Sequence, residues 1–249
     1  MSDTVNSGLS DPAASKDAYE GWHAQLAVDS NTDTPWHRLV KTHLIPDRDL
    51  AGKRVLEIAC GRGGFACWLA SNRQSPGEVV ASDFSATAVG KGKDFAAQHG
   101  VTGVTWKVGD IQCLDHEDAS FDTVISCETI EHVPDPRRAL NELARVLKPG
   151  GRLFLTTPNY LGVMGLYRLY LRLTGRRFTE EGQPINNFTI LPWTRQWVAS
   201  TGLHVTKVDA VGHYLLTPGR LPIELPIFNN PRIVMRWFAH HSLIVAEKQ

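Results

Sequence analysis

The chain has 249 residues, and its 26 Lys and Arg residues balance its 26 Asp and Glu residues. A content of 42% hydrophobic and 21% charged residues is typical of a globular protein and excludes a disordered or fibrous chain. Proteins whose main partner is nucleic acid carry an excess of positive charge to bind phosphates. The balanced charge therefore makes nucleic acid an unexpected partner, and the length corresponds to one large domain.

Residues 1–17 are rich in Ser, Asp and Ala, and we expect them to be disordered. They lack the apolar core of a signal peptide, and no apolar run is long enough to span a bilayer. The four cysteines show no Cys-x-x-Cys spacing, so we expect free thiols rather than disulfides or zinc ligands. Together these features predict a cytoplasmic protein.

Aromatic and apolar residues recur at helix-like spacing between Tyr19 and His43, which predicts one or two helices. Beyond them, short apolar runs alternate with helical patterns. The expected strands cover residues 54–60, 78–83, 104–110, 121–127, 151–157, 203–210 and 242–248. The expected helices cover residues 65–71, 86–99, 139–147 and about 192–201. Such alternation predicts a parallel sheet covered by helices on both faces.

The first expected strand runs directly into a glycine-rich turn, EIACGRGG, over residues 57–64. A strand, a tight glycine loop and a helix place exposed backbone N–H groups at the carboxyl end of the sheet, where a ligand binds. The turn lacks the G-x-G-x-x-G spacing of dinucleotide-binding proteins, and the chain has no Tyr-x-x-x-Lys pair, so a nucleotide-dependent oxidoreductase is disfavoured. Asp83 ends the second strand, where its carboxylate can accept both hydroxyls of a ribose, and Asp110 ends the third.

These motifs resemble those of the class I S-adenosylmethionine-dependent methyltransferases. VLEIACGRGG is similar to the first motif of that family, ASDFS to the second, GDIQCL to the adenine-contacting motif, and LKPGGRLFLTTPN to the helix-turn-strand that follows. The resemblance is dense over residues 54–159. It implies an α/β, Rossmann-like fold with a seven-stranded, mostly parallel sheet, an antiparallel last strand and helices on both faces. It also implies S-adenosyl-L-methionine as the methyl donor.

The resemblance implies that the cofactor contacts Glu57, Ala59, Gly61, Asp83, Phe84, Asp110, Ile111 and Cys127. The first three would hold the methionine moiety, and Asp83 would hold the ribose. The remaining four would surround the adenine. Ala59 departs from the family pattern, in which glycine is usual, but a methyl group is small and we expect it to be tolerated.

Directly after the fourth expected strand comes a second group of chemically active residues, Glu128, Glu131 and His132. On a helical turn these side chains converge. They could bind Mg²⁺, His132 could act as a general base oriented by the glutamates, or all three could simply stabilise the turn. The E-x-x-E-H-V spelling is similar to that of ubiquinone-pathway O-methyltransferases and of a group of small-RNA 2′-O-methyltransferases, in both of which it binds metal. A further ligand would come from downstream, with His204 and His213 as candidates.

The resemblance divides the single domain, residues 18–249, into lid helices (18–50), a cofactor-binding core (51–159) and two substrate-side insertions (160–190 and 214–241). Residues 160–177 carry arginines among Leu, Tyr and Met. This stretch could lie on a membrane surface as a peripheral contact, or it could form a helical cover over the substrate pocket. The second insertion is expected to be a substrate wall or a homodimer contact.

A phenolic hydroxyl needs a base or a metal to lose its proton, whereas an amine needs only to be deprotonated before it binds. The cluster of Glu128, Glu131 and His132 therefore favours O-methylation of an aromatic or apolar small molecule over N- or C-methylation. Metal-dependent 2′-O-methylation of RNA remains an alternative that the zero net charge disfavours. The intact acidic and glycine motifs disfavour a non-catalytic cofactor-binding subunit.

Overall fold

The computed structural model describes residues 12–28, 30–73, 75–176, 178, 183, 185–215, 223–229 and 234–249. The strands of its main sheet are β1 (Arg54–Ile58), β2 (Glu78–Asp83), β3 (Val104–Val108), β4 (Phe121–Cys127), β5 (Leu147–Pro158), β6 (Leu203–Val211) and β9 (His241–Lys248). Two short strands, β7 (Tyr214–Leu215) and β8 (Ile223–Glu224), pair separately. The helices are α1 (Pro12–Gln25), α2 (Pro35–His43), α3 (Pro46–Asp49), α4 (Gly64–Ala70), α5 (Ala86–Gln98), α6 (Pro136–Val146), α7 (Val163–Leu173) and α8 (Leu191–Ser200). Three 3₁₀ turns complete the set: η1 (Ile130–His132), η2 (Pro226–Asn229) and η3 (Val234–Phe238).

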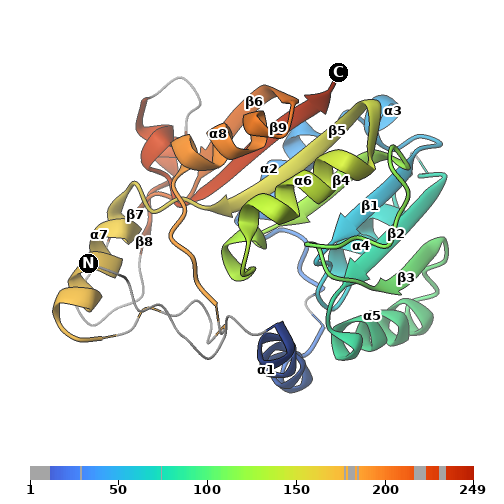
Figure 1. The fold of residues 1–249 in the computed structure, drawn as a ribbon, viewed down its shortest axis with the longest axis horizontal. Helices are drawn as coiled ribbons and strands as arrows, with labels where there is room; N and C mark the ends of the chain where they lie inside the picture. The colour runs from blue at the N-terminus through green and yellow to red at the C-terminus, as the bar shows by residue number, and fades with distance from the viewer. Residues whose placement is uncertain are drawn as a thin grey trace.

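The main sheet has the strand order β3-β2-β1-β4-β5-β9-β6 and lies between two layers of helices (Figure 1). Its first five strands are parallel. The last strand in the chain, β9, runs antiparallel to both of its neighbours, β5 and β6. The expected seven-stranded, mostly parallel sheet with an antiparallel last strand is therefore confirmed.

Both faces of the central strands are buried, which explains their near-continuous apolar sequences. Val55 and Val79 belong to a core cluster that includes residues of α2 and α4. Their neighbours Leu56 and Val80 point to the opposite face and join a cluster with residues of α6 and α8. Alternation along each strand thus supplies two separate cores, one for each helical layer.

Several element bounds differ from the sequence expectations. Residues 12–17, expected to be disordered, form the start of α1, where Pro12 suits the first helical position and the alanines favour helix; residues 1–11 lie outside the described part. The expectation of one or two helices between Tyr19 and His43 is confirmed by α1 and α2, and the short α3 follows them before β1. Strand β5 begins at Leu147, because that residue already pairs with Phe121 of β4 before the ladder shifts its register.

Asn159, which follows β5, joins both substrate-side insertions to the sheet. Its Nδ2 donates to the carbonyl oxygens of Trp237 and Ala239 at 2.7 and 2.9 Å, and its Oδ1 accepts from the N–H of Leu191 at 3.0 Å. The side chain is fully buried. Because each buried group left unpaired would cost about 1–3 kcal/mol, this one amide fixes where both insertions return to the core.

Candidate active site

A cavity of about 430 Å³ lies at the carboxyl ends of the parallel strands. The residues that the resemblance assigned to the cofactor all line it: Glu57, Ala59, Gly61, Asp83, Phe84, Asp110, Ile111 and Cys127. They come from the ends of four adjacent strands and the turns that follow them. The structure thus brings the whole predicted set together, as expected for a ligand at this edge of a parallel sheet.

The turn between β1 and α4 has an unusual backbone. Ala59, Gly61 and Gly63 have φ values of 56°, 51° and 77°, in the left-handed region. A Cβ atom on Gly63 would lie 2.2 Å from the ring of Trp106, so only glycine fits there. Ala59 is accommodated, but the left-handed conformation costs a residue with a side chain about 1–2 kcal/mol.

Two carboxyl groups lie at the floor of the cavity. Asp83 accepts hydrogen bonds from the N–H groups of Gly61 (2.8 Å) and Ser85 (3.0 Å); burial raises its pKa to about 6 although these bonds act to lower it. Glu57 is buried, and its Oε2 makes no hydrogen bond within the described residues. Burial and the nearby charge of Asp83 raise the pKa of Glu57 to about 8. Such a pair fits a positively charged ligand, which would stabilise both carboxylates.

Helix α1 is held against α5 by a charge at each contact. Glu20 accepts hydrogen bonds from the N–H groups of Ala86 (2.7 Å) and Thr87 (3.0 Å) at the start of α5. Lys91 of α5 donates to three carbonyl oxygens around the end of α1 at 2.6 to 2.9 Å. Each charge faces the helix end of opposite partial charge. Burial acts to raise the pKa of Glu20, but the hydrogen bonds outweigh it and hold the pKa at about 2.

This docking places rings from α1 over the cofactor end of the cavity. Tyr19 packs edge-on against Phe84 with the ring centroids 5.2 Å apart. His23 lies with its Nε2 4.0 Å from Oδ1 of Asp83. Burial and the charge of Arg62 lower the pKa of His23 to about 4, so this ring is neutral at pH 7.

The side chains of Glu128, Glu131 and His132 do not converge as a helical turn would predict. Only Ile130–His132 is helical, and the turn ends at Val133, because the residue before a proline is disfavoured in helical geometry. Glu128 lies before the turn with a left-handed φ of 48°.

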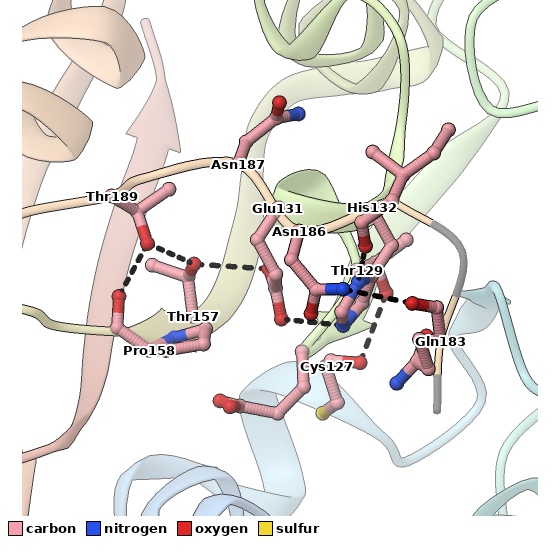
Figure 2. A network of polar contacts seen from close by, with 12 residues as sticks. Cys127, Thr129, Glu131, His132, Thr157, Pro158, Gln183, Asn186, Asn187 and Thr189 are labelled. Atoms are coloured by element: carbon pink, nitrogen blue, oxygen red, sulfur yellow. Dashed lines mark hydrogen bonds and ion pairs between the residues drawn. The ribbon is translucent and has the colours of Figure 1, made fainter. Parts of the chain in front are cut away.

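The two glutamates consequently face different partners. Glu131 is fully buried; its Oε2 accepts from the hydroxyl of Thr157 at 3.0 Å, and its Oε1 lies 3.5 Å from Nε2 of His132 (Figure 2). Glu128 faces His241 instead, at 3.3 Å. Among the described residues, no group of three or more His, Cys, Asp or Glu side chains is placed to hold a metal ion. The predicted Mg²⁺ donor set is not assembled in this arrangement.

His132 ties the first insertion to the site. Its Nδ1 donates to the carbonyl oxygen of Ile185 at 2.6 Å. Burial lowers its pKa, although this bond and the charge of Glu128 act to raise it. Nearby, the N–H of Asn187 donates to the carbonyl of Glu131 at 2.7 Å, and its side chain donates to the carbonyl of Val133, also at 2.7 Å. These bonds hold residues 185–187 against the turn, where Ile185 lines the cavity; Figure 2 shows Asn186 and Asn187 beside Glu131 and His132.

Neither downstream histidine that the sequence suggested reaches the cavity. His204 is exposed on β6, and His213 is bonded through Nδ1 to Asn229 (3.1 Å) and through Nε2 to the carbonyl of Met235 (2.8 Å). His240 and His241 line the cavity instead. Their only sequence signal is that two histidines stand directly before an apolar strand.

Helix α7 does not line the cavity, so the interpretation of residues 160–177 as a cover over the pocket is wrong. From the first insertion, only Gln183 and Ile185 reach the cavity within the described residues. Several apolar side chains of α7 are exposed, with Leu173 at 78% and Leu166 at 68%.

A family model described as a methyltransferase domain matches residues 56–155. The chain is 30% identical over 171 residues to ubiquinone biosynthesis O-methyltransferase of Coxiella burnetii, covering 66% of this chain and 69% of that protein. It is 31% identical over 211 residues to demethylmenaquinone methyltransferase of Clavibacter sepedonicus, covering 81% and 82%. A Haloferax volcanii methyltransferase solved in complex with the Trm112 methyltransferase activator has a TM-score of 0.64 at 21% identity, covering 93% of this chain and 96% of that chain.

The sheet order, the glycine turn and the acidic strand ends define an α/β enzyme with a nucleoside-binding site. The chain belongs to the class I S-adenosylmethionine-dependent methyltransferases. The residues present fit this cofactor. Its sulfonium and ammonium groups are positively charged, and the buried carboxylates of Glu57 and Asp83 need such a partner. When bound, the cofactor supplies an electrophilic methyl group.

Replacing Ala59 by glycine should stabilise the protein. It removes a left-handed strain of about 1–2 kcal/mol and adds about 0.5–1 kcal/mol of chain entropy loss on folding, a net gain of up to about 1.5 kcal/mol. Urea unfolding measures this, and the affinity for S-adenosylhomocysteine should not change. Ala81→Gly in β2 is the control and should lose stability; a loss in Ala59→Gly would contradict the prediction.

Binding of S-adenosylmethionine should release about one proton at pH 7. Glu57, with a pKa of about 8, is mostly protonated at pH 7, and a cation bound beside it favours the ionised form. The release should vanish at pH 9, where Glu57 is already ionised. Calorimetry in buffers of different ionisation enthalpy counts these protons.

Glu57→Gln should abolish the release, whereas Glu78→Gln, at the opposite end of the sheet, should leave it intact. An equal proton count at pH 7 and pH 9 in the unmodified enzyme would show that Glu57 is not the group responsible.

Proposed function

We propose that the enzyme methylates a hydroxyl oxygen of a small aromatic or apolar molecule. The observation that carries this proposal is one cavity lined by two kinds of residue. It is lined by the cofactor residues and also by the rings of Trp36, His37, His240 and His241. Aromatic and imidazole rings favour a planar, largely apolar acceptor.

The protonation of these rings supports oxygen as the methylated atom. Burial and the charge of Lys41 lower the pKa of His37 to about 4, and burial with the neighbouring His241 lowers that of His240 to about 3. Both rings are neutral at pH 7, and a neutral imidazole can accept a hydrogen bond from the hydroxyl of an acceptor. Two similar proteins are named ubiquinone biosynthesis O-methyltransferase and demethylmenaquinone methyltransferase, which agrees with an aromatic acceptor.

In this proposal, Glu128, Glu131 and His132, which the sequence suggested as catalytic residues, have different roles. Glu128 and His132 line the cavity, whereas Glu131 does not and lies with its Oε1 3.5 Å from Nε2 of His132. His132 would contact the acceptor with its ring positioned by the hydrogen bond to Ile185. N-methylation, C-methylation and RNA methylation are the alternatives that the following experiment separates.

The test incubates the enzyme and labelled S-adenosylmethionine with catechol, 4-nitrocatechol, aniline and a short single-stranded RNA, and identifies the products by mass spectrometry. We expect methyl ethers of the catechols. Asp83→Ala should reduce kcat/KM by about 10- to 100-fold, because the variant loses the carboxylate that is expected to accept hydrogen bonds from both ribose hydroxyls of the cofactor. Transfer only to nitrogen, carbon or RNA would contradict the proposal.

We also propose that residues 160–177 make a peripheral membrane contact, through which the enzyme reaches an apolar acceptor. In α7, Leu166, Leu169, Tyr170 and Leu173 follow the spacing i, i+3, i+4, i+7, and all four are exposed. The helix carries arginines and no acidic residue. It lies at one end of the molecule, beyond the end of β5 (Figure 1).

An exposed apolar stripe with arginines is typical of a helix that lies in a membrane interface. Within the described residues, no helix is long and apolar enough to cross a membrane.

The double substitution Leu166→Glu/Leu173→Glu should weaken sedimentation with phosphatidylglycerol-containing vesicles by at least about 10-fold, because burying a leucine contributes about 1.5–3 kcal/mol. Ile45→Glu, at an exposed apolar residue of the α3 region, is the control and should bind normally. Light scattering on the same variants tests the homodimer: a dimer that α7 substitutions dissociate, with no vesicle binding, would contradict the membrane contact.

A further inference from the structure

The backbone of Glu128 is held in a costly conformation. Its left-handed φ of 48° is unfavourable by about 1–2 kcal/mol for a residue with a side chain. The neighbouring strand β5 holds it there: the N–H of Glu128 donates to both the carbonyl oxygen and the hydroxyl of Thr156, each at 3.1 Å. Strain of this kind gathers at functional sites, where it aims a side chain that ordinary geometry would not.

The strained backbone directs the Glu128 carboxylate to His241. The distance from Oε2 of Glu128 to Nδ1 of His241 is 3.3 Å, and the other carboxylate oxygen makes no hydrogen bond within the described residues. Both side chains are largely buried, at 16% and 10% exposure. A carboxylate oxygen can only accept, so Nδ1 of His241 carries the proton and the free electron pair lies on Nε2.

The His241 ring is held by packing as well. Its centroid lies 5.3 Å from that of Trp36 in α2 and 6.5 Å from that of Tyr214 in β7. At Gly212, with φ 87°, a Cβ atom would lie 3.1 Å from the ring. His241 lines the same cavity as Glu57 and Gly61. The imidazole is thus both oriented and confined beside the cofactor site.

The other imidazoles in the cavity are placed differently. His132 has its Nδ1 bonded to Ile185 and its Nε2 turned to Glu131. His37 bonds to Thr34 through Nδ1 at 2.8 Å and stacks on Phe65. With pKa values of about 4 and about 3, His37 and His240 are weak bases at neutral pH. His23 and His132 turn Nε2 to the carboxylates of Asp83 and Glu131, at 4.0 and 3.5 Å. Among the described imidazoles of the cavity, His241 is the one that turns Nδ1 to a carboxylate, at 3.3 Å, and so leaves Nε2 for an acceptor.

From this geometry we infer that His241 is the general base of methyl transfer and that Glu128 is its positioning residue, an inference that rests on the proposed O-methylation. The acceptor O–H proton passes to Nε2 of His241. An oxygen electron pair forms the bond to the methyl carbon as the carbon–sulfur bond breaks, and that bond's electrons remain on sulfur as the neutral thioether. The imidazolium is stabilised by the Glu128 carboxylate and returns its proton to solvent.

The test compares catechol with 4-nitrocatechol, whose more acidic hydroxyl is already ionised at pH 8 and needs no base. His241→Asn should lower kcat for catechol by about 10²–10⁴-fold and that for 4-nitrocatechol much less. Glu128→Gln should show the same selectivity with a smaller loss. The affinity of each variant for S-adenosylhomocysteine should match that of the unmodified enzyme.

His43→Asn is the matched control, because His43 forms a similar pair with Asp209 (2.8 Å) and does not line the cavity. Its rate should be unchanged with both acceptors. Equal losses with both acceptors in His241→Asn, or no loss at all, would overturn the inference.

If the enzyme methylates neither catechol, the proposed O-methylation is contradicted instead. In that case ¹H–¹⁵N NMR of the imidazoles tests the His241–Glu128 pair by showing which ring nitrogen of His241 is protonated. Protonation of His241 at Nδ1 that is lost in Glu128→Gln supports the pair, whereas protonation at Nε2 in the unmodified enzyme overturns it.

Discussion

The tight turn after β1 is the constraint on which the site depends. Trp106 of β3 lies under it so closely that Cβ atoms on Gly63 and Gly92 would come within 2.2 and 2.4 Å of the ring. One indole therefore sets the spacing between the turn, α5 and the edge of the sheet. Asp83 adds a polar link by accepting the N–H of Gly61. The cofactor end of the cavity is consequently a rigid frame, whereas the acceptor end is assembled from segments distant in the sequence.

This division explains what could be predicted from the sequence. The bounds of β2 and β4 agree with the expectation, because a strand that is buried on both faces has a continuous apolar sequence. The cofactor residues follow those strands directly, so their convergence follows from the parallel order. Local spacing carries no information about Glu128 and His241, which are 113 positions apart and meet only because β9 inserts beside β5.

The group of Glu128, Glu131 and His132 shows how a local pattern can mislead. Helical spacing would place these side chains together, but the hydrogen bonds from Glu128 to Thr156 keep that residue outside the turn. Glu131 turns inward to Thr157, in the same strand as Thr156. Adjacent threonines of β5 thus separate the glutamates, and only tertiary structure could reveal it. The hydrophobic spacing of the sequence likewise gives no sign that Glu20 and Lys91 hold α1 against α5.

The buried amide of Asn159 has a consequence for engineering acceptor specificity. Because it binds the backbone of both insertions at once, the walls of the acceptor site behave as one module rather than two. A chimera that exchanged only the 160–190 segment with a relative would have to match a hydrogen-bond pattern set by the 237–239 segment. Recombination between family members is therefore best placed before Asn159 and after β9 begins, so that both segments travel together.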